Sequence, residues 1–309
     1  MFVGGPVTEE QLVRIGAAAP GVACRHFPEQ DGLEADVADA DVVAGRLSPA
    51  GLARARRLRW LHSWAAGPDM LLYPEMVASD VVLTCSKGNG AVPLAEHAVM
   101  LMLLLNRDAR RWLRAQDERR WESFSHGELN GLTCGIVGLG YSGQDLALKA
   151  KAFHMRVLGV RRHPGPTPNV DEVVGPEDVG RVLRESDFVV VTAPRTPETE
   201  GMLGEAEFRA MKPTAFYICF SRGGIADDAV LERALREGWI AGAGLDAHSL
   251  EPLPPDSPFW TTPNTIVTPH NGATTPHTRS RGVDIFIDNL RRFAAGEPLR
   301  NVVNKELGY

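Results

Sequence analysis

The chain has 309 residues, of which 44% are hydrophobic and 23% are charged, and its formal net charge is -6. A chain of this length exceeds one typical core and suggests two domains, while its ordinary composition excludes disordered and fibrous proteins. The acidic total provides no electrostatic footprint for nucleic acid or for an anionic membrane. We therefore expect a soluble globular protein with neither kind of partner.

The cysteines and the ends of the chain exclude further classes. The 4 cysteines are scattered singly, without the spacing of a zinc site or the density of a disulfide framework, at Cys24, Cys85, Cys134 and Cys219. We expect reduced core thiols and no metal. The first residues lack the basic and apolar regions of a signal peptide, and the longest apolar run, 98–105, is far shorter than the roughly 20 residues of a membrane helix. A cytoplasmic location follows as an expectation.

The first third alternates short apolar runs with helix-like stretches, which is typical of a parallel sheet. Strands are expected within 42–44, 58–62 and 81–84, and helices over 8–19 and 48–57. Thr8 and Ser48 are expected as N-caps, with Gln11 completing a capping box after Thr8. Only Phe2 and Val3 precede Gly4, so either the first strand is vestigial or the natural start lies upstream.

The alternation restarts after two helices that connect the halves of the chain. One helix is expected over 93–107, with Pro93 at its first position, and a charged one over 110–120. Strands then follow at 133–138, 156–160, 188–192, 215–219 and 240–245, with helices at 143–153 and 227–238. The last helix, 276–295, could return the chain to the first domain. The pattern predicts an α/β fold of two Rossmann-like, doubly wound parallel-sheet domains.

A glycine motif lies between a predicted strand and a predicted helix. Gly138, Gly140 and Gly143 have the G-x-G-x-x-G spacing. The first glycine allows a tight turn, the second lets backbone amides approach a pyrophosphate, and the third permits close helix packing. A glycine-rich turn of any α/β protein is the alternative, but strand, glycines and helix together favour a dinucleotide.

Basic residues stand where the next predicted strand ends. An NAD site commonly carries an acid about 20 residues after the glycines, where it binds the ribose hydroxyls. This chain has Arg161 and Arg162 there. An arginine binds a 2′-phosphate through charge-assisted hydrogen bonds, so we predict NADP(H) as the preferred cofactor, with NAD(H) as the other possible one. The alternative is a solvated loop of arginines.

Three reactive residues stand at or just past the ends of later strands: Arg222, Glu251 and His270. Ligands bind at the carboxyl ends of strands in a doubly wound sheet. Each residue has an ordinary interpretation on its own, as a surface arginine, a turn glutamate and a loop histidine. Their positions predict that all three converge at that edge of the sheet.

With these motifs the sequence resembles the D-isomer-specific 2-hydroxyacid dehydrogenase family, which includes glyoxylate/hydroxypyruvate reductases and phosphoglycerate dehydrogenases. The resemblance covers nearly the whole chain and is carried by the glycine motif and by the segments 192–199 (Thr-Ala-Pro-Arg-Thr-Pro-Glu-Thr), 221–224 (Ser-Arg-Gly-Gly), 245–254 (Leu-Asp-x5-Pro-Leu-Pro) and 268–270 (Thr-Pro-His). It implies an NAD(P)-dependent oxidoreductase acting on a small 2-oxo or D-2-hydroxy acid. It also implies that Arg222, Glu251 and His270 are the catalytic residues.

The chemistry of such a reaction requires this set of residues. A cation must hold the substrate carboxylate and polarise the ketone, and an acid must protonate the developing alkoxide. We assign Arg222 to the first task and His270 to the second. Glu251 would hydrogen-bond His270, orient its ring and favour the imidazolium.

The resemblance also implies residues that bind the cofactor and the substrate. Cofactor contacts are expected from Gly138, Gly140, Tyr141, Ser142, Gly143, Arg161, Arg162, Ala193, Pro194, Thr199, Cys219, Phe220, Ser221, Asp246, His270 and Gly272. Substrate contacts are expected from Ala66, Gly67, Lys87, Gly88, Asn89, Arg222 and His270, with backbone amides meeting the substrate carboxylate. His97 is interpreted as a helix packing residue, and His248 is left undecided. Cys219 departs from the asparagine that is common in the family.

The domain organisation follows from the same resemblance. A substrate-binding, flavodoxin-like domain is expected over 1–98 plus 277–309 and a dinucleotide-binding domain over 99–276, with the active site in the cleft between them. Since the family is usually dimeric, a homodimer is expected through the helices over 93–120. Two alternatives stay open: a catalytically silent, dinucleotide-sensing protein such as the corepressors that share this fold, and a formate- or phosphite-type dehydrogenase.

Overall fold

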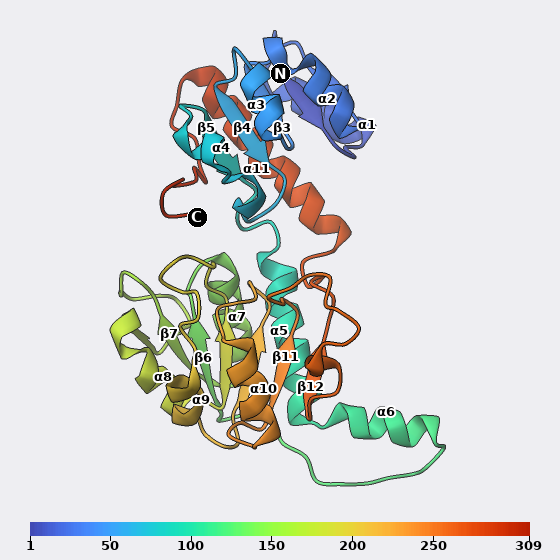
Figure 1. Ribbon diagram of the computed structural model, residues 1–309, viewed down its shortest axis with the longest axis vertical. Helices are drawn as coiled ribbons and strands as arrows, with labels where there is room; N and C mark the ends of the chain where they lie inside the picture. The colour runs from blue at the N-terminus through green and yellow to red at the C-terminus, as the bar shows by residue number, and fades with distance from the viewer. The chain divides into compact units, whose positions relative to one another are not determined.

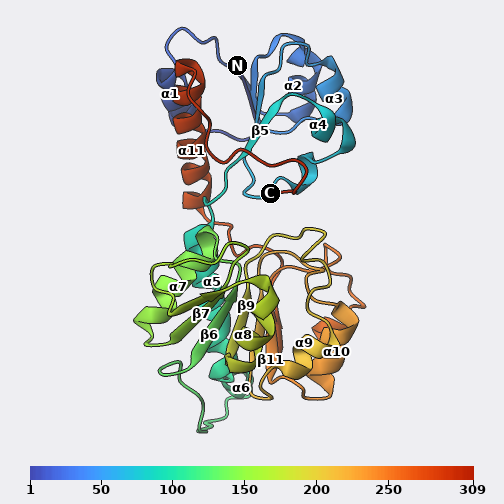
Figure 2. The same cartoon turned by 90° about the vertical axis from the view of Figure 1, so that its left-hand side faces the viewer.

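The computed structural model describes all residues, Met1–Tyr309, and divides them into two compact units. The first unit combines Met1–Gly90 with Thr275–Tyr309, and the second is Ala91–Thr274. Each unit is built around its own parallel sheet, as Figures 1 and 2 show. The predicted fold class is therefore confirmed. No helix is both long and apolar enough to cross a membrane.

The first unit holds a five-stranded parallel sheet in the order β2-β1-β3-β4-β5. Its strands are β1 (Phe2–Gly4), β2 (Arg25–Phe27), β3 (Val42–Ala44), β4 (Trp60–Ser63) and β5 (Val82–Cys85). Its helices are α1 (Glu9–Ala18), α2 (Gln30–Asp36), α3 (Pro49–Arg54), α4 (Pro74–Ala78) and α11 (Pro276–Ala295). Although β1 has only 3 residues, it is fully buried and pairs with a strand on each side.

The local signals read from the sequence are present in this unit. Thr8 caps α1 and forms the predicted capping box with Gln11, and the side chain of Ser48 caps α3 by accepting from the amide of Gly51 at 3.0 Å. The helix α11 begins and ends where it is predicted and does return to the first unit. It does so because its apolar face, including Phe286, is buried against the side of the sheet that carries Trp60.

The second unit holds a seven-stranded parallel sheet in the order β12-β11-β10-β9-β6-β7-β8. The strands are β6 (Thr133–Val137), β7 (Arg156–Val160), β8 (Glu172–Val174), β9 (Phe188–Val191), β10 (Phe216–Cys219), β11 (Gly242–Leu245) and β12 (Thr265–Val267). The helices are α5 (Ala91–Asn106), α6 (Ala109–Asp117), α7 (Tyr141–Ala152), α8 (Val179–Glu185), α9 (Glu205–Ala210) and α10 (Asp228–Arg236). Short 3-10 turns occupy 176–178 and 258–260 in this unit, and 37–39 and 69–71 in the first unit. The strand order reverses at β6, so the end of β6 is a switch point where ligands bind.

Several expectations need correction. The helix predicted from Pro93 begins at Ala91, so Pro93 stands third, still within the first turn, where a backbone N–H has no helical partner. The expected domain boundary at residue 98 falls inside α5, whereas the contacts assign the whole helix to the second unit. Its buried face packs in one cluster with Cys134 of β6. Cys24 is exposed rather than a core thiol, because it precedes the edge strand β2; the other three cysteines are buried.

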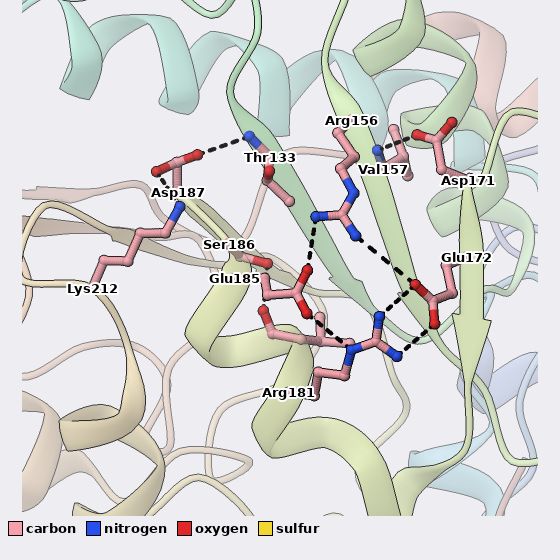
Figure 3. Close-up of polar contacts among 11 residues, drawn as sticks. Thr133, Arg156, Val157, Asp171, Glu172, Arg181, Glu185, Ser186, Asp187 and Lys212 are labelled. Atoms are coloured by element: carbon pink, nitrogen blue, oxygen red, sulfur yellow. Dashed lines mark hydrogen bonds and ion pairs between the residues drawn. The ribbon is translucent and has the colours of Figure 1, made fainter.

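Ion pairs join the amino ends of the strands in the second unit (Figure 3). Arg181 of α8 binds both carboxylate oxygens of Glu172, at 2.6 and 2.7 Å, and its Nε donates to Glu185 at 2.9 Å. Arg156, the first residue of β7, donates to Glu185 at 2.7 Å. Asp187 accepts from the amide of Thr133 and from Lys212, and these contacts tie the starts of four strands together.

Candidate active site

The glycine turn after β6 has the shape that a pyrophosphate requires. Gly138 has a φ of 106°, and a Cβ there would lie 2.6 Å from the amide nitrogen of Ala193. A Cβ on Gly143 would collide with the carbonyl oxygen of Gly138, so α7 can start this close to the strand only with glycine. Gly140 is exposed, and nothing lies within 4 Å of a Cβ built on it. The start of α7 carries no side-chain cap, so its amides are available to an anion.

The predicted phosphate-binding arginines follow β7, the neighbour of β6. Both side chains are exposed, and the amide of Arg161 donates to the carbonyl of Val174 at 3.0 Å. Arg162 forms an ion pair with Glu198, which belongs to the segment after β9. The structure thus places a cation and an anion together at the position where the ribose of a dinucleotide binds in this fold.

Glu251 and His270 form a close pair. Nδ1 of His270 lies 2.8 Å from both carboxylate oxygens of Glu251, and each side chain is 37% exposed. His270 has a φ of 50°, in the left-handed region that a non-glycine residue adopts only when its surroundings hold it there. The exposed ring can reach a ligand through Nε2 while Nδ1 stays on the carboxylate.

Asp246 holds the loop that carries His270. It follows β11 and is 0% exposed. One carboxylate oxygen accepts from the hydroxyl of Thr268 at 2.7 Å and from the amide of Asn271 at 3.1 Å, and the other accepts from the amide of Gly272 at 3.0 Å. A Cβ on Gly272 would lie 2.9 Å from this carboxylate. The structure therefore gives Asp246 and Gly272 a positioning role, beside the cofactor contact that the resemblance implies.

Two histidines outside the predicted set belong to the same network. Nε2 of His97 lies 3.0 Å from the hydroxyl of Thr268, so this residue is hydrogen-bonded rather than only packed. The amide of His248 donates to Glu251 at 2.9 Å, and its ring nitrogen Nε2 lies 3.0 Å from the carbonyl of Thr268. The contacts with Thr268 escaped the sequence analysis because Thr268 stands 171 residues from His97 and 20 residues from His248 along the chain.

Arg222 lies on the loop after β10 and is half-buried. Its Nη1 donates to the carbonyl of Ser221 at 2.7 Å. The backbone carbonyl of Arg222 accepts from the thiol of Cys219 at 3.3 Å, and burial raises the pKa of that thiol, so the neutral donor persists. A Cβ on Gly223 would collide with the backbone of His248, so this loop abuts the segment that leads to Glu251.

The other implied cofactor residues lie at the same edge of the sheet. Tyr141 and Ser142 begin α7, Ala193, Pro194 and Thr199 follow β9, and Phe220 and Ser221 follow β10. Because the strands are parallel, all of these segments meet at the carboxyl ends of one sheet. The predicted catalytic and cofactor residues of this unit are therefore gathered at one edge.

Comparison with known proteins decides the family. Residues 99–272 match the model of the D-isomer specific 2-hydroxyacid dehydrogenase, NAD binding domain. The glyoxylate reductase of Korarchaeum cryptofilum is 36% identical over 267 residues, 82% of this chain and 78% of that protein. The chain belongs to the D-isomer-specific 2-hydroxyacid dehydrogenase family. The second unit is accordingly the NAD-binding domain of an NAD(P)-dependent oxidoreductase.

Two solved structures extend the similarity over the whole chain. An NADPH-dependent glyoxylate/hydroxypyruvate reductase from Sinorhizobium meliloti, in complex with NADP and sulfate, has a TM-score of 0.85 and 30% identity, covering 100% of this chain and 99% of that one. A D-isomer specific 2-hydroxyacid dehydrogenase from Xanthobacter autotrophicus Py2, in complex with NADPH and MES, has a TM-score of 0.87 and 31% identity, with coverage of 100% and 99%. The first unit therefore has the fold of the family as well.

In this dehydrogenase the implied substrate residues of the first unit lie on two neighbouring loops. The amides of Ala66, Gly67 and Gly88 donate no hydrogen bond within the chain. Asn89 is buried, and its side-chain amide donates to the carbonyl of Trp64 at 3.4 Å, which links the loops. Lys87 is exposed, with its ammonium 5.3 Å from the centre of the Tyr309 ring.

A buried polar network beneath these loops was missed from the sequence. His62 of β4 is 0% exposed, with Nδ1 2.8 Å from the hydroxyl of Thr84 and Nε2 3.1 Å from the hydroxyl of Ser86. The indole N–H of Trp60 also donates to Thr84, at 2.8 Å. Burial lowers the pKa of His62 to about 3, so its ring is neutral. It holds Ser86 at the start of one loop, a role that no sequence motif signals.

Proposed function

We propose that this dehydrogenase reduces a small 2-oxo acid to the D-2-hydroxy acid and catalyses the reverse oxidation. The observation that carries the proposal is the Glu251–His270 pair, held at the carboxyl ends of the same sheet whose glycine turn fits a dinucleotide. A proton donor and a hydride donor are the two groups that a carbonyl reduction requires.

The residues divide the reaction between them. A bound nicotinamide cofactor supplies the hydride. Arg222 holds the carboxylate of the substrate and polarises its ketone oxygen, as a guanidinium does through two parallel N–H donors. His270 donates a proton from Nε2 to the oxygen that gains negative charge, while its Nδ1 proton stays on the ring and is donated in a hydrogen bond to Glu251, which fixes the ring orientation. In the oxidative direction Nε2 of His270 accepts the proton of the hydroxyl.

NADP(H) is the proposed preferred cofactor. Arg161 and Arg162 follow β7, where the ribose 2′ position is recognised in this fold. A guanidinium matches a phosphate in charge and in geometry. The reductase from Sinorhizobium meliloti was solved with NADP and the relative from Xanthobacter autotrophicus with NADPH, which supports the same choice here.

The proposed substrate site includes the loops of the first unit. Ala66, Gly67 and Gly88 offer backbone amides, while Asn89 and Lys87 add a polar and a charged side chain. Backbone amides that have no partner in the chain can bind the carboxylate of a substrate, whatever the size of the substrate's side chain. Glyoxylate and hydroxypyruvate are the first substrates to test because the curated relative from Korarchaeum cryptofilum is a glyoxylate reductase and the relative from Sinorhizobium meliloti acts on both acids by name.

A homodimer and a cytoplasmic location complete the proposal. Exposed apolar side chains gather on α6 and the segment after it: Trp112, Leu113 (57% exposed) and Trp121 (100% exposed). Figure 1 shows α6 lying away from the sheet of its own unit. Large exposed aromatic residues are typical of interfaces, and a second copy of the chain would cover them. Light scattering of the full chain tests whether the protein is a homodimer.

The deciding experiment measures oxidation of NADPH and of NADH by the purified protein with a panel of 2-oxo acids, followed by chiral analysis of the product. We expect a D-hydroxy acid that forms faster with NADPH. Tight dinucleotide binding without turnover of any acid would instead identify a sensing protein. Turnover of formate or phosphite alone would identify a different dehydrogenase.

A further inference from the structure

The ion pair between Arg162 and Glu198 spans the cofactor end of the sheet. Arg162 follows β7 and Glu198 belongs to the segment after β9, and β6 lies between these two strands. The pair therefore reaches across the end of the strand whose glycine turn fits the pyrophosphate. The Arg162 side chain is 35% exposed and that of Glu198 65%, so both are open to a ligand from solvent.

The position of Glu198 is fixed by an ordered turn. The amide of Thr196 donates to the hydroxyl of Thr199 at 2.8 Å, and this hydroxyl donates to the carbonyl of Pro194 at 2.7 Å. These bonds close the segment on both sides of Glu198. The second carboxylate of the segment, Glu200, is already paired with Arg195. Glu198 is thus the carboxylate of this segment that is directed to the arginine after β7.

A carboxylate at this place acts oppositely on the two dinucleotides. The 2′-phosphate of NADP(H) carries up to two negative charges and needs the guanidinium that Glu198 occupies, so Glu198 competes with it and repels it. The ribose of NAD(H) presents a neutral 2′-hydroxyl, which can donate a hydrogen bond to a carboxylate, as it does to the acid of an NAD site. The end of this sheet therefore contains both an acid and arginines.

We propose that Glu198 is a specificity-determining residue that competes with the 2′-phosphate for Arg162 and so keeps NAD(H) usable. The inference rests on the proposed cofactor function, in which Arg161 and Arg162 bind that phosphate. The preference between the two cofactors then depends on two competing ion pairs of Arg162, one with Glu198 and the other with the 2′-phosphate of the ligand. Exposed ion pairs are weak, so a ligand dianion can displace Glu198 from Arg162.

The test measures dissociation constants of NADPH and NADH for the full chain by calorimetry, in the wild type, E198Q, R162Q and the double variant. We expect E198Q to tighten NADPH by about three- to tenfold and to leave NADH unchanged or weaker. The effect should vanish in the R162Q background and shrink at high salt. E200Q is the matched control, since Glu200 lies in the same segment but pairs with Arg195, and it should leave both constants unchanged.

The outcomes separate this inference from the proposed function. If R162Q weakens NADPH while E198Q leaves the ratio of the two constants unchanged or weakens NADPH, the arginine binds the phosphate and the role of Glu198 is wrong. If R162Q and R161Q together leave the ratio unchanged, the proposed preference for NADP(H) itself fails. Thermal unfolding of each variant shows whether a change in binding reflects a change in folding.

Discussion

The two ends of the sheet in the second unit use the same charged residue types in different ways. At the amino ends, Arg181 is bound by Glu172 and Glu185, and Glu185 is bound in turn by Arg156 (Figure 3). Hydrogen bonds from Arg181 and Arg156 lower the pKa of Glu185. At the carboxyl ends, His270 uses one ring nitrogen on Glu251, and its ring is exposed.

The difference lies in how many nitrogen atoms of each group are bound to carboxylates. The planar guanidinium of Arg181 has its Nε and both Nη atoms engaged. In the pair at the opposite end, Nδ1 of His270 is engaged, which leaves Nε2 for the proposed proton transfer. Variants at the amino ends should therefore change stability, and variants at the carboxyl ends should change turnover.

The largest effect is expected from H270A. Removing the proton donor should lower kcat by about 10²- to 10⁴-fold, the usual contribution of general acid catalysis. Binding of NADPH should survive, because the glycine turn is untouched. Steady-state kinetics and cofactor fluorescence measure the two quantities. A variant that retains wild-type kcat at neutral pH would show that the proton comes from another group.

The next largest effect is expected from R222A, which should lower kcat/KM by about 10²- to 10³-fold because the guanidinium serves both binding and the transition state. R222K should recover only part of the loss, since an ammonium lacks the planar pair of donors. Added guanidinium ion should restore activity to R222A. If KM rises while kcat stays constant, Arg222 only binds the substrate and does not polarise the ketone.

A stability effect that depends on pH is expected at His62, at the sheet of the first unit. Its pKa is about 3 in the folded state and near 6.5 when unfolded. The unfolded chain therefore takes up a proton first, and the stability is fully present above pH 6.5 and falls as the pH drops toward 3. The loss is about 1.4 kcal/mol per pH unit.

Denaturant unfolding of the wild type and of H62Q at pH 7 and pH 5 measures this effect. The difference in free energy of unfolding between the two proteins should shrink by about 2 kcal/mol over that interval, because H62Q lacks the titrating ring. Parallel curves would mean that the His62 ring is not held neutral. They would contradict its assignment as the buried support of Ser86.

The smallest effect is expected from R181A, which removes the centre of the amino-end ion pairs. These pairs are exposed, so the midpoint of thermal unfolding should fall by only about 2 °C. Turnover and both cofactor constants should equal those of the wild type. R181A is thus the matched control for H270A and R222A, and a loss of kcat in it would break the contrast between the two ends of the sheet.

Local patterns predicted most of the elements that carry the site. β7 and α11 have the predicted bounds, and β6, β9 and β10 differ by one residue at an end, because their apolar runs are bounded by glycine or polar residues. The sequence missed β2, β8 and β12, which have 3 residues each and lie at the edges of the two sheets. Strands this short leave too few residues for an alternation to be recognised.

The sequence by itself determined the fold class and the glycine turn, because both depend on local patterns of residue types, and its motifs led to the proposal of Arg222, Glu251 and His270 as the catalytic residues. The tertiary structure alone decided which groups meet. His97 and Asp246 both bond to the Thr268 hydroxyl, and Arg162 pairs with Glu198. Along the chain, Thr268 stands 171 residues from His97 and 22 from Asp246, and Arg162 stands 36 residues from Glu198. Such contacts follow from strand order, which brings distant segments to one edge of a sheet and which local pattern does not encode.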